Sequence, residues 1–306
     1  MTINFFFAKF VINYQLSIVN CQLSIVNYQL SIIKVDLFYY TFFQHALWAS
    51  LFTSIACGIV GTYIVARRLV FISGGITHAS FGGLGLGFYL GINPILSAMF
   101  FSVASAFGVE WLSKKQGVRE DSAIAAFWSL GMALGVICIF LTPGYTPNIS
   151  AYLFGNILTV TKSDLWMIGM VALALFVSFA FFMNSILYSA FDREFAQVKG
   201  LPVTLIEHLM MFAIAVTIVS SIRLVGIMLL LSMLTLPQMT ANLFTSRFKM
   251  LLVYSVLVGI LSCFSGLLFS YFLNIPSGAT IIFVQVILYL LCKAGIFLYQ
   301  RTIKQA

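Results

Sequence analysis

His78 is the ionisable residue that lies deepest in an apolar stretch, near the middle of residues 69–91. An ionisable side chain at that depth is costly to bury and marks a functional site by default. Neutral imidazole is a common ligand of zinc, manganese and iron. The alternative is a histidine that is hydrogen-bonded to a neighbouring helix, and the residue types alone leave both interpretations open.

Small and hydroxyl-bearing residues surround this histidine in the same stretch. Ser73, Thr77 and Ser80 supply hydroxyl groups, and glycines occupy many of the remaining positions. Small residues let helix backbones approach closely, and residues 83–87 contain the Gly-x-x-x-Gly spacing typical of such contacts. Small residues also leave room for an ion, so we predict that the three hydroxyl side chains line a pathway.

A second polar group interrupts a later apolar run. Pro237 removes a backbone hydrogen bond from a helix that contains it, which predicts a kink. Thr235 and Gln238 flank the proline and can satisfy the freed backbone groups or face a channel, and we assign both to the pathway lining. The pair Glu207-His208 falls near a predicted span end, where both side chains reach the interface cheaply, so a metal site there is not favoured.

The longest polar stretch after residue 35 covers residues 190–202. Phe191, Phe195 and Val198 recur at helical spacing with charges between them, which predicts a short amphipathic helix. Gly200 then ends the helix. Such a helix between two spans suits a docking element for a soluble partner, or else a helix that lies on the membrane surface.

Several functional classes are excluded by what the sequence lacks. It has no GxxxxGK[ST], GxSxG or HExxH motif, so ATP binding by a P-loop and an enzyme active site have no support. The net charge of +8 does not indicate nucleic-acid binding, because the cations sit singly or in pairs at the ends of apolar runs. The five cysteines show no CxxC spacing, and four of them lie in apolar runs, where we expect small packing residues.

The elements that must position these residues are membrane-spanning helices. Apolar residues make up 61% of the 306 residues, charged residues make up 8%, and the mean hydropathy is +1.06. Soluble domains contain roughly 25% charged residues, so the bilayer is the natural solvent of this chain. With about 20 apolar residues needed for each span, we predict an all-α polytopic bundle of about eight or nine transmembrane helices and a short cytoplasmic helix. The predicted spans lie near residues 42–66, 69–91, 94–112, 122–141, 163–188, 204–221, 224–244, 251–273 and 279–299, and residues 151–160 are expected to form a re-entrant or interfacial helix.

Lysine and arginine residues set the orientation of this bundle. If Arg67 and Arg68 are cytoplasmic, alternation of the spans places all but four of the 16 cations at or near the same side. The four exceptions are Lys9, Lys34, Lys162 and Arg223. This consistency predicts a multi-pass protein of the bacterial inner membrane that contacts lipid, with the amphipathic helix and the C-terminus in the cytoplasm.

The first 34 residues differ from the rest. Residues 13–33 contain three copies of a seven-residue repeat, Asn-Tyr/Cys-Gln-Leu-Ser-Ile-Val/Ile, without the flanking charges of a coiled coil or the cleavage motif of a signal peptide. We therefore expect residues 1–34 to be a non-structural extension or a mis-assigned start, and residues 35–306 to form the transmembrane domain. No methionine lies between Met1 and Met99, so a start near Val35 would use a non-ATG codon.

Four features, in this order, resemble the permease family of bacterial zinc, manganese and iron ABC importers. Residues 61–83, with Ile72-Ser-Gly-Gly-Ile-Thr-His78-Ala-Ser-Phe-Gly-Gly, are similar to the family's second-helix signature. Residues 192–200 are similar to its coupling helix, and residues 234–241 and 273–281 are similar to later landmarks. The resemblance extends approximately from residue 36 to residue 298.

The resemblance implies one subunit of an ATP-driven importer. A homodimer of this chain would form the path, a separate pair of P-loop ATPase subunits would hydrolyse ATP, and an extracytoplasmic protein would deliver the metal. The divalent ion is then cargo, and no permanently bound cofactor is expected. The ATPase-docking residues that it implies are Asp192, Arg193, Glu194, Phe195, Ala196 and Gly200.

The resemblance also bears on His78. The matching histidine of the family lines the pathway near an aspartate four residues earlier, but this chain has Gly74 there. A lone imidazole is a weaker site for a hard divalent cation than an imidazole beside a carboxylate. His78 is therefore the expected transient ligand, with two copies across a dimer or the hydroxyl residues as its support.

Other classes of membrane protein stay open. A secondary transporter often shows inverted repeats and intramembrane carboxylates, but we find no carboxylate at a span centre and no evident repeat of halves. An ABC permease for haem, cobalamin or a chelate would share the coupling helix, and the His78 segment argues against it. A membrane scaffold without transport activity is a more distant alternative.

Overall fold

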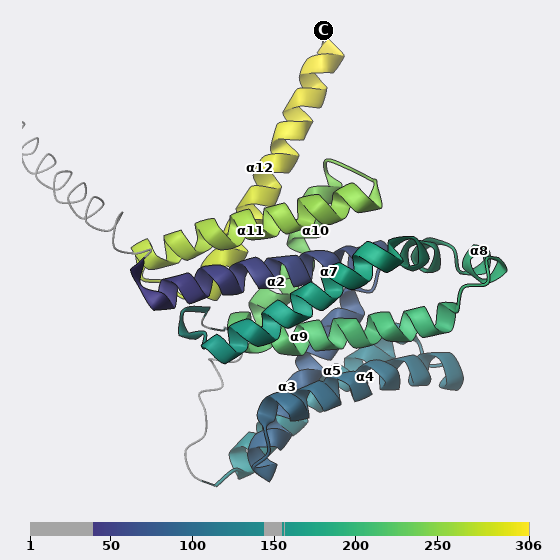
Figure 1. The fold of residues 1–306 in the computed structure, drawn as a ribbon, viewed down its shortest axis with the longest axis vertical. Helices are drawn as coiled ribbons and strands as arrows, with labels where there is room; N and C mark the ends of the chain where they lie inside the picture. Colours follow the sequence, from purple (N-terminus) through teal and green to yellow (C-terminus); the bar gives the residue numbers. More distant parts are fainter. Residues whose placement is uncertain (1–38, 144–154, 156, 306) are drawn as a thin grey trace, which may run out of the picture. The chain divides into compact units, whose positions relative to one another are not determined.

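The computed structural model describes residues 39–143, 155 and 157–305, and helices dominate these residues (Figure 1). The repeat within residues 1–34 and most of the predicted helix 151–160 lie outside the described residues. The chain divides into two units, Met1–Gln44, whose described part is the start of α2, and His45–Ala306, which holds the other elements. The helices are α2 (Thr41–Ala66), α3 (Val70–Leu90), α4 (Pro94–Gln116), α5 (Glu120–Leu141), α7 (Lys162–Phe191), α8 (Arg193–Val198), α9 (Val203–Met233), α10 (Leu236–Asn242), α11 (Phe248–Leu273) and α12 (Ser277–Gln305), with a 3-10 turn, η2, at Ile157–Thr159.

The helical polytopic bundle predicted from composition is confirmed. Seven helical segments of the described residues are long and apolar enough to cross a membrane. α3 is outside this group because its glycines, hydroxyls and histidine lower its hydropathy, although most of its residues are buried. The seven segments include the 40-residue stretch Val203–Asn242, which contains two breaks and replaces the predicted sixth and seventh spans.

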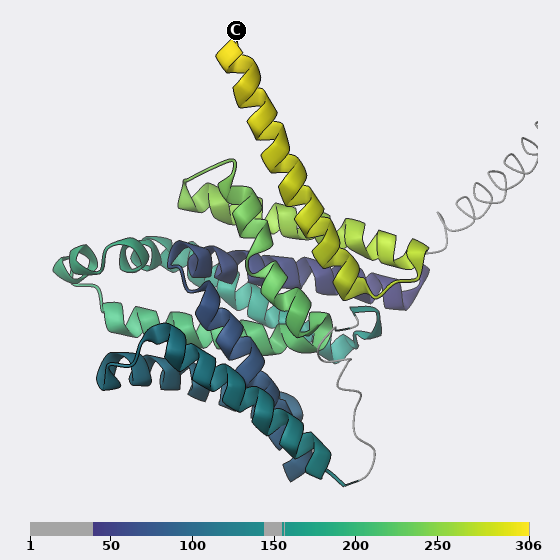
Figure 2. The ribbon, with the colours of Figure 1, turned by 180° about the vertical axis from the view of Figure 1, so that it is seen from behind.

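The first of the two breaks differs in position from the sequence prediction, and the second agrees with it. α9 runs through the expected boundary at residues 222–223 and is interrupted instead at Gly226, whose φ of 77° and ψ of 166° suit a residue without a β-carbon. The second break lies at Thr235. Pro237 sits in the first turn of α10, directly after this break, so the predicted interruption of the helix at the proline is confirmed. Figure 2 shows the chain changing direction between α9 and α11.

At several glycines, α3 and its neighbours approach backbone to backbone. A β-carbon on Gly131 of α5 would lie 2.4 Å from Ala79 Cα, and one on Gly85 would lie 2.5 Å from the carbonyl oxygen of Gly135. Non-bonded carbon atoms in contact lie about 3.5–4.0 Å apart. The glycines therefore allow α3 and α5 to approach at a distance that a side chain would prevent.

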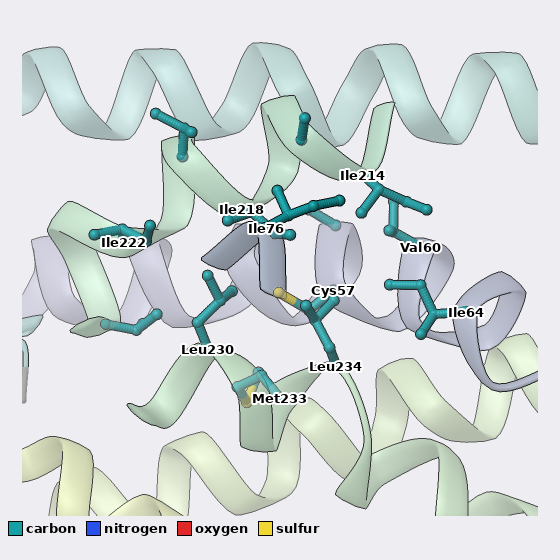
Figure 3. Packing of buried hydrophobic residues seen from close by; sticks show 14 of the residues in the cluster. Cys57, Val60, Ile64, Ile76, Ile214, Ile218, Ile222, Leu230, Met233 and Leu234 are labelled. Carbon is teal, nitrogen blue, oxygen red and sulfur yellow. The ribbon is translucent and has the colours of Figure 1, made fainter. Parts of the chain in front are cut away.

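The residues between the two breaks, 227–234, form a separate segment at the end of α9. The hydrophobic core lies where this segment meets α2, α3 and the first part of α9. Buried aliphatic side chains from these elements face one another there, and the thiol of Cys57 lies among them (Figure 3). The labelled core residues are Cys57, Val60, Ile64, Ile76, Ile214, Ile218, Ile222, Leu230, Met233 and Leu234. The core thus fixes the segment between the breaks against the helix that carries His78.

Candidate ion pathway and docking site

His78 is half-buried on α3 and stacks on Trp128 of α5. The two ring centroids are 4.1 Å apart and the planes differ by 11°. His78 Nδ1 is buried and has no hydrogen-bond partner within the described part of the chain. An unpartnered buried nitrogen requires an explanation, and a transient ligand is one. Sequence reasoning missed Trp128, which lies in another predicted span and belongs to no motif.

Gly74 faces the same space, one helical turn before the histidine. A β-carbon at this position would meet Trp128 Cζ3 at 3.4 Å and Leu231 Cδ2 at 3.6 Å, which are ordinary or slightly tight contacts. Leu231 belongs to the segment between the breaks, so this segment and α3 border a common region beside His78. Across the described residues, no group of three or more His, Cys, Asp or Glu side chains could hold a metal ion. Gly74 itself supplies no carboxylate to the imidazole.

The three predicted hydroxyl residues of α3 are buried within the protomer. Ser73, Thr77 and Ser80 donate to carbonyl oxygens of their own helix, at Val70, Ser73 and Thr77, with distances of 2.8, 2.6 and 2.6 Å. These bonds satisfy the hydroxyls locally, as serine and threonine often do inside helices. Their part in a pathway stays a prediction.

Gln238 replaces the hydrogen bond that Pro237 cannot make. The carbonyl of Met233 would ordinarily accept from the N–H of residue 237, and Gln238 Nε2 donates to it at 3.3 Å instead. The same nitrogen donates to the carbonyl of Cys57 on α2 at 3.0 Å. Gln238 is fully buried, whereas Thr235 is half-buried and donates to the carbonyl of Leu231 at 2.9 Å. Gln238 therefore holds the second break against α2.

A further buried amide, Gln285 of α12, fixes the segment between the breaks from the other side. Ser232 donates to Gln285 Oε1, and Gln285 Nε2 lies 3.3 Å from Ser262 Oγ on α11. Sequence reasoning missed Gln285, although a lone glutamine inside an apolar span was the signal that could have identified it.

One end of the bundle, which we call the Arg67 end, contains a cavity of about 340 Å³. It is lined by Arg67 after α2, Glu110 of α4, Glu120 of α5, Arg193 of α8 and Glu207 of α9. These residues come from the helix ends that the alternation of spans predicts on one side. The charged lining makes this cavity unlike the apolar surfaces elsewhere on the bundle.

Glu207 is buried at this end, so the expectation that it reaches the interface freely is wrong. Its side chain is 8% exposed, with Oε1 3.0 Å from Arg67 Nη2 and Oε2 3.4 Å from Arg193 Nη1. His208 is instead 41% exposed, and its Nε2 lies 3.6 Å from Glu110 Oε2. The two neighbours in sequence therefore have different partners. Sequence reasoning missed the contact with Arg67 because 140 positions separate the two residues.

α8 lies at one end of the bundle (Figure 1), and some of its apolar side chains are exposed. Asp192 caps the helix by accepting from the N–H of Phe195 at 2.9 Å, Ala196 is fully buried, and Gly200 adopts a φ of 73° after the helix. Phe195 is 44% exposed and Val198 is 87% exposed. The predicted amphipathic pattern thus leaves an uncovered apolar face, flanked by the exposed charges of Arg193 and Glu194.

At the opposite end, Arg223 has a fixed partner. Its Nη1 lies 3.1 Å from Oδ1 of Asp164, whose side chain is only 5% exposed. Asp164 also forms a capping box with Thr161 at the start of α7. Arg223 was one of the four cations outside the predicted cytoplasmic set, and a buried carboxylate accounts for its position at this end.

These features define a class: a polytopic membrane protein without an ATP-binding motif of its own, with an imidazole inside the bundle whose Nδ1 has no partner among the described residues, and with a short exposed helix. The ABC 3 transport family matches residues 39–295, and the chain belongs to that family. It is a permease subunit rather than an enzyme, as the sequence predicted.

The similar proteins agree with this assignment. The chain is 38% identical over 260 residues to an uncharacterised membrane protein of Synechocystis. The aligned region covers 85% of this chain and 92% of that protein. It is 32% identical to the manganese transport system membrane protein MntC of Halalkalibacterium halodurans, over 84% of this chain and 88% of MntC. The structure of PsaBC from Streptococcus pneumoniae in complex with Fab matches with a TM-score of 0.78 and 27% identity, over 86% of this chain and 95% of that chain.

Proposed function

We propose that this chain forms the ion path of an ATP-driven importer for a divalent metal ion, zinc, manganese or iron, in the bacterial inner membrane. The observation that carries the proposal is His78, a metal-ligating side chain inside an apolar bundle whose buried Nδ1 has no partner in the described residues. The manganese transport relative supports a metal as the cargo. The ion passes through and is released, so one weak ligand suits the task better than a closed site.

α8 is the proposed docking element for a separate ATPase. Its uncovered apolar side chains would be unfavourable in water and are instead buried when a soluble partner covers them. The docking set is Asp192, Arg193, Glu194, Phe195, Ala196 and Gly200, in which Asp192, Ala196 and Gly200 shape the helix and the other three offer side chains. The Arg67 end then faces the cytoplasm, in line with the positive-inside rule.

The remaining partners follow from the same proposal. A second copy of the chain would bring a second imidazole to the path, which compensates for Gly74. An extracytoplasmic metal-binding protein would deliver the ion to the opposite end. A secondary transporter is less well supported, because the carboxylates of the described residues lie near helix ends rather than at span centres.

Uptake of manganese, zinc and iron by cells that depend on this importer tests the ligand role. His78→Ala should lower uptake by about tenfold or more, the range found when metal-site groups are removed. His45→Ala is the matched control. It removes an imidazole near the start of α2, away from His78, and should leave uptake unchanged. Wild-type uptake and unchanged metal selectivity in His78→Ala would remove the ligand role.

A further inference from the structure

Three segments meet at one guanidinium at the Arg67 end. Arg67 follows α2 and precedes α3, and its Nη1 donates to the carbonyls of Ser189 and Ala190 at 3.2 and 3.4 Å. Those carbonyls close the last turn of α7, just before α8 begins. Arg67 Nη2 donates to Glu207 of α9 at 3.0 Å. Arg67 therefore connects the turn between α2 and α3 to the end of α7 and the start of α9.

Glu207 extends this connection to the docking helix. One carboxylate oxygen contacts Arg67 and the other contacts Arg193, which is the first residue of α8. Glu207 is nearly enclosed, whereas Arg193 is 46% exposed and reaches inward from the surface. A buried carboxylate shared by two arginines is weakly screened by solvent, so a displacement of either arginine changes the energy of the other.

A short turn with a defined backbone conformation links Arg67 to α3. Arg68 adopts a left-handed φ of 59°, and the N–H of Leu69 donates to the carbonyl of Ile64 at 2.8 Å. α3 begins at the next residue and carries His78. The charged contacts thus lead from α8 to the helix that holds the candidate ligand.

We infer that Glu207 is the positioning residue that couples α8 to α3, so that movement of the docking helix by the ATPase is transmitted through Arg193, Glu207 and Arg67 to the start of the His78 helix. The inference rests on the proposed function, because it requires that α8 docks the ATPase. Glu207 is 8% exposed and lies between the two arginines, so it acts through them. Its loss should therefore uncouple ATP hydrolysis from transport rather than abolish either binding event.

The test uses the full complex of this chain with its ATPase in proteoliposomes, with the metal-binding protein and Mn²⁺ outside. ATP hydrolysis and Mn²⁺ uptake are measured in the same preparation. Glu207→Gln should retain the ATPase and its hydrolysis rate within about twofold, while Mn²⁺ taken up per ATP falls by about tenfold, within the range of coupling between sites. Asp121→Asn removes an exposed carboxylate near the start of α5 and should leave both quantities unchanged.

A second variant covers the case in which Glu207→Gln does not fold. Arg67→Lys keeps the positive charge, lies outside the docking set and leaves the contact of Glu207 with Arg193 in place, but it loses the guanidinium that joins Glu207 to the end of α7. It should lower uptake per ATP by about fivefold, the lower end of the range of such coupling. A proportional fall of hydrolysis and uptake in both variants, or an unchanged ratio, overturns the coupling role.

The outcomes separate this inference from the proposed function. If the wild-type chain does not retain the ATPase, or if Mn²⁺, Zn²⁺ and Fe²⁺ are not taken up, the proposed function fails. If the wild type transports metal and both variants keep the wild-type ratio of uptake to hydrolysis, only the role of Glu207 fails.

Discussion

Adding one carbon at Gly131 tests the close contact between α3 and α5. In Gly131→Ala the new carbon would lie 2.4 Å from Ala79 Cα and 2.8 Å from Ala79 O. Restoring ordinary contact requires the two helices to separate by about 1.2 Å. Because the new carbon meets backbone atoms of α3, which cannot rotate away, the overpacking should lower the free energy of unfolding by about 3 kcal/mol, the upper part of the usual range. Alanine returns about 1 kcal/mol of helix propensity, so we expect a net loss of about 2 kcal/mol.

Equilibrium unfolding of the purified chain in mixed micelles measures this loss. Gly295→Ala is the matched control, because nothing lies within 4 Å of its β-carbon position on α12. That variant should be neutral or stabilised by up to about 1 kcal/mol. If Gly131→Ala is as stable as Gly295→Ala, the backbone contact between α3 and α5 is refuted.

Two other substitutions address the candidate pathway. Gly74→Asp places a carboxylate one turn before His78, between Trp128 and Leu231. Because carboxylates suit manganese, this variant should shift uptake toward Mn²⁺ over Zn²⁺. Competition between the two ions measures the preference, and an unchanged preference would contradict the geometry. Gln238→Ala leaves the carbonyl of Met233 without its donor and should destabilise the chain by about 1–3 kcal/mol. Unfolding in mixed micelles checks this against the exposed Gln197→Ala, and equal stability of the two variants would argue against the role of Gln238.

The sequence predicted the elements better than their contacts. Apolar run length located the helices, and burial cost identified His78 before any neighbour was known. Trp128, its stacking partner, could not be found because nothing in a single sequence pairs two spans at a chosen depth. Glu207 was placed near the right helix end, but its burial depends on Arg67, which is distant in sequence. Local rules describe each helix, whereas ion pairs between helices depend on the packed bundle.

The two breaks illustrate the same limit. The break before Pro237 could be predicted, because a proline lacks an N–H donor and disfavours helical backbone in the residue before it. Gly226 carried less signal, since glycine is frequent inside transmembrane helices. The prediction that Gln238 can satisfy freed backbone groups is confirmed by its bond to Met233. A missing donor can thus be inferred locally, whereas the exact position of a break depends on what packs beside it.

The glycine contacts of α3 have a consequence for its axial register. Interlocking side chains resist sliding of one helix along another, because the side-chain ridges of one helix would have to leave the grooves of the other. Backbone-to-glycine contacts lack such ridges and offer little resistance along the helix axis. At these positions the register of α3 depends on its few large contacts, such as His78 on Trp128, and on the short connections at its ends, Arg67–Leu69 and Gly91–Asn93. The depth at which the imidazole lies in the bilayer therefore depends partly on residues far from the imidazole itself.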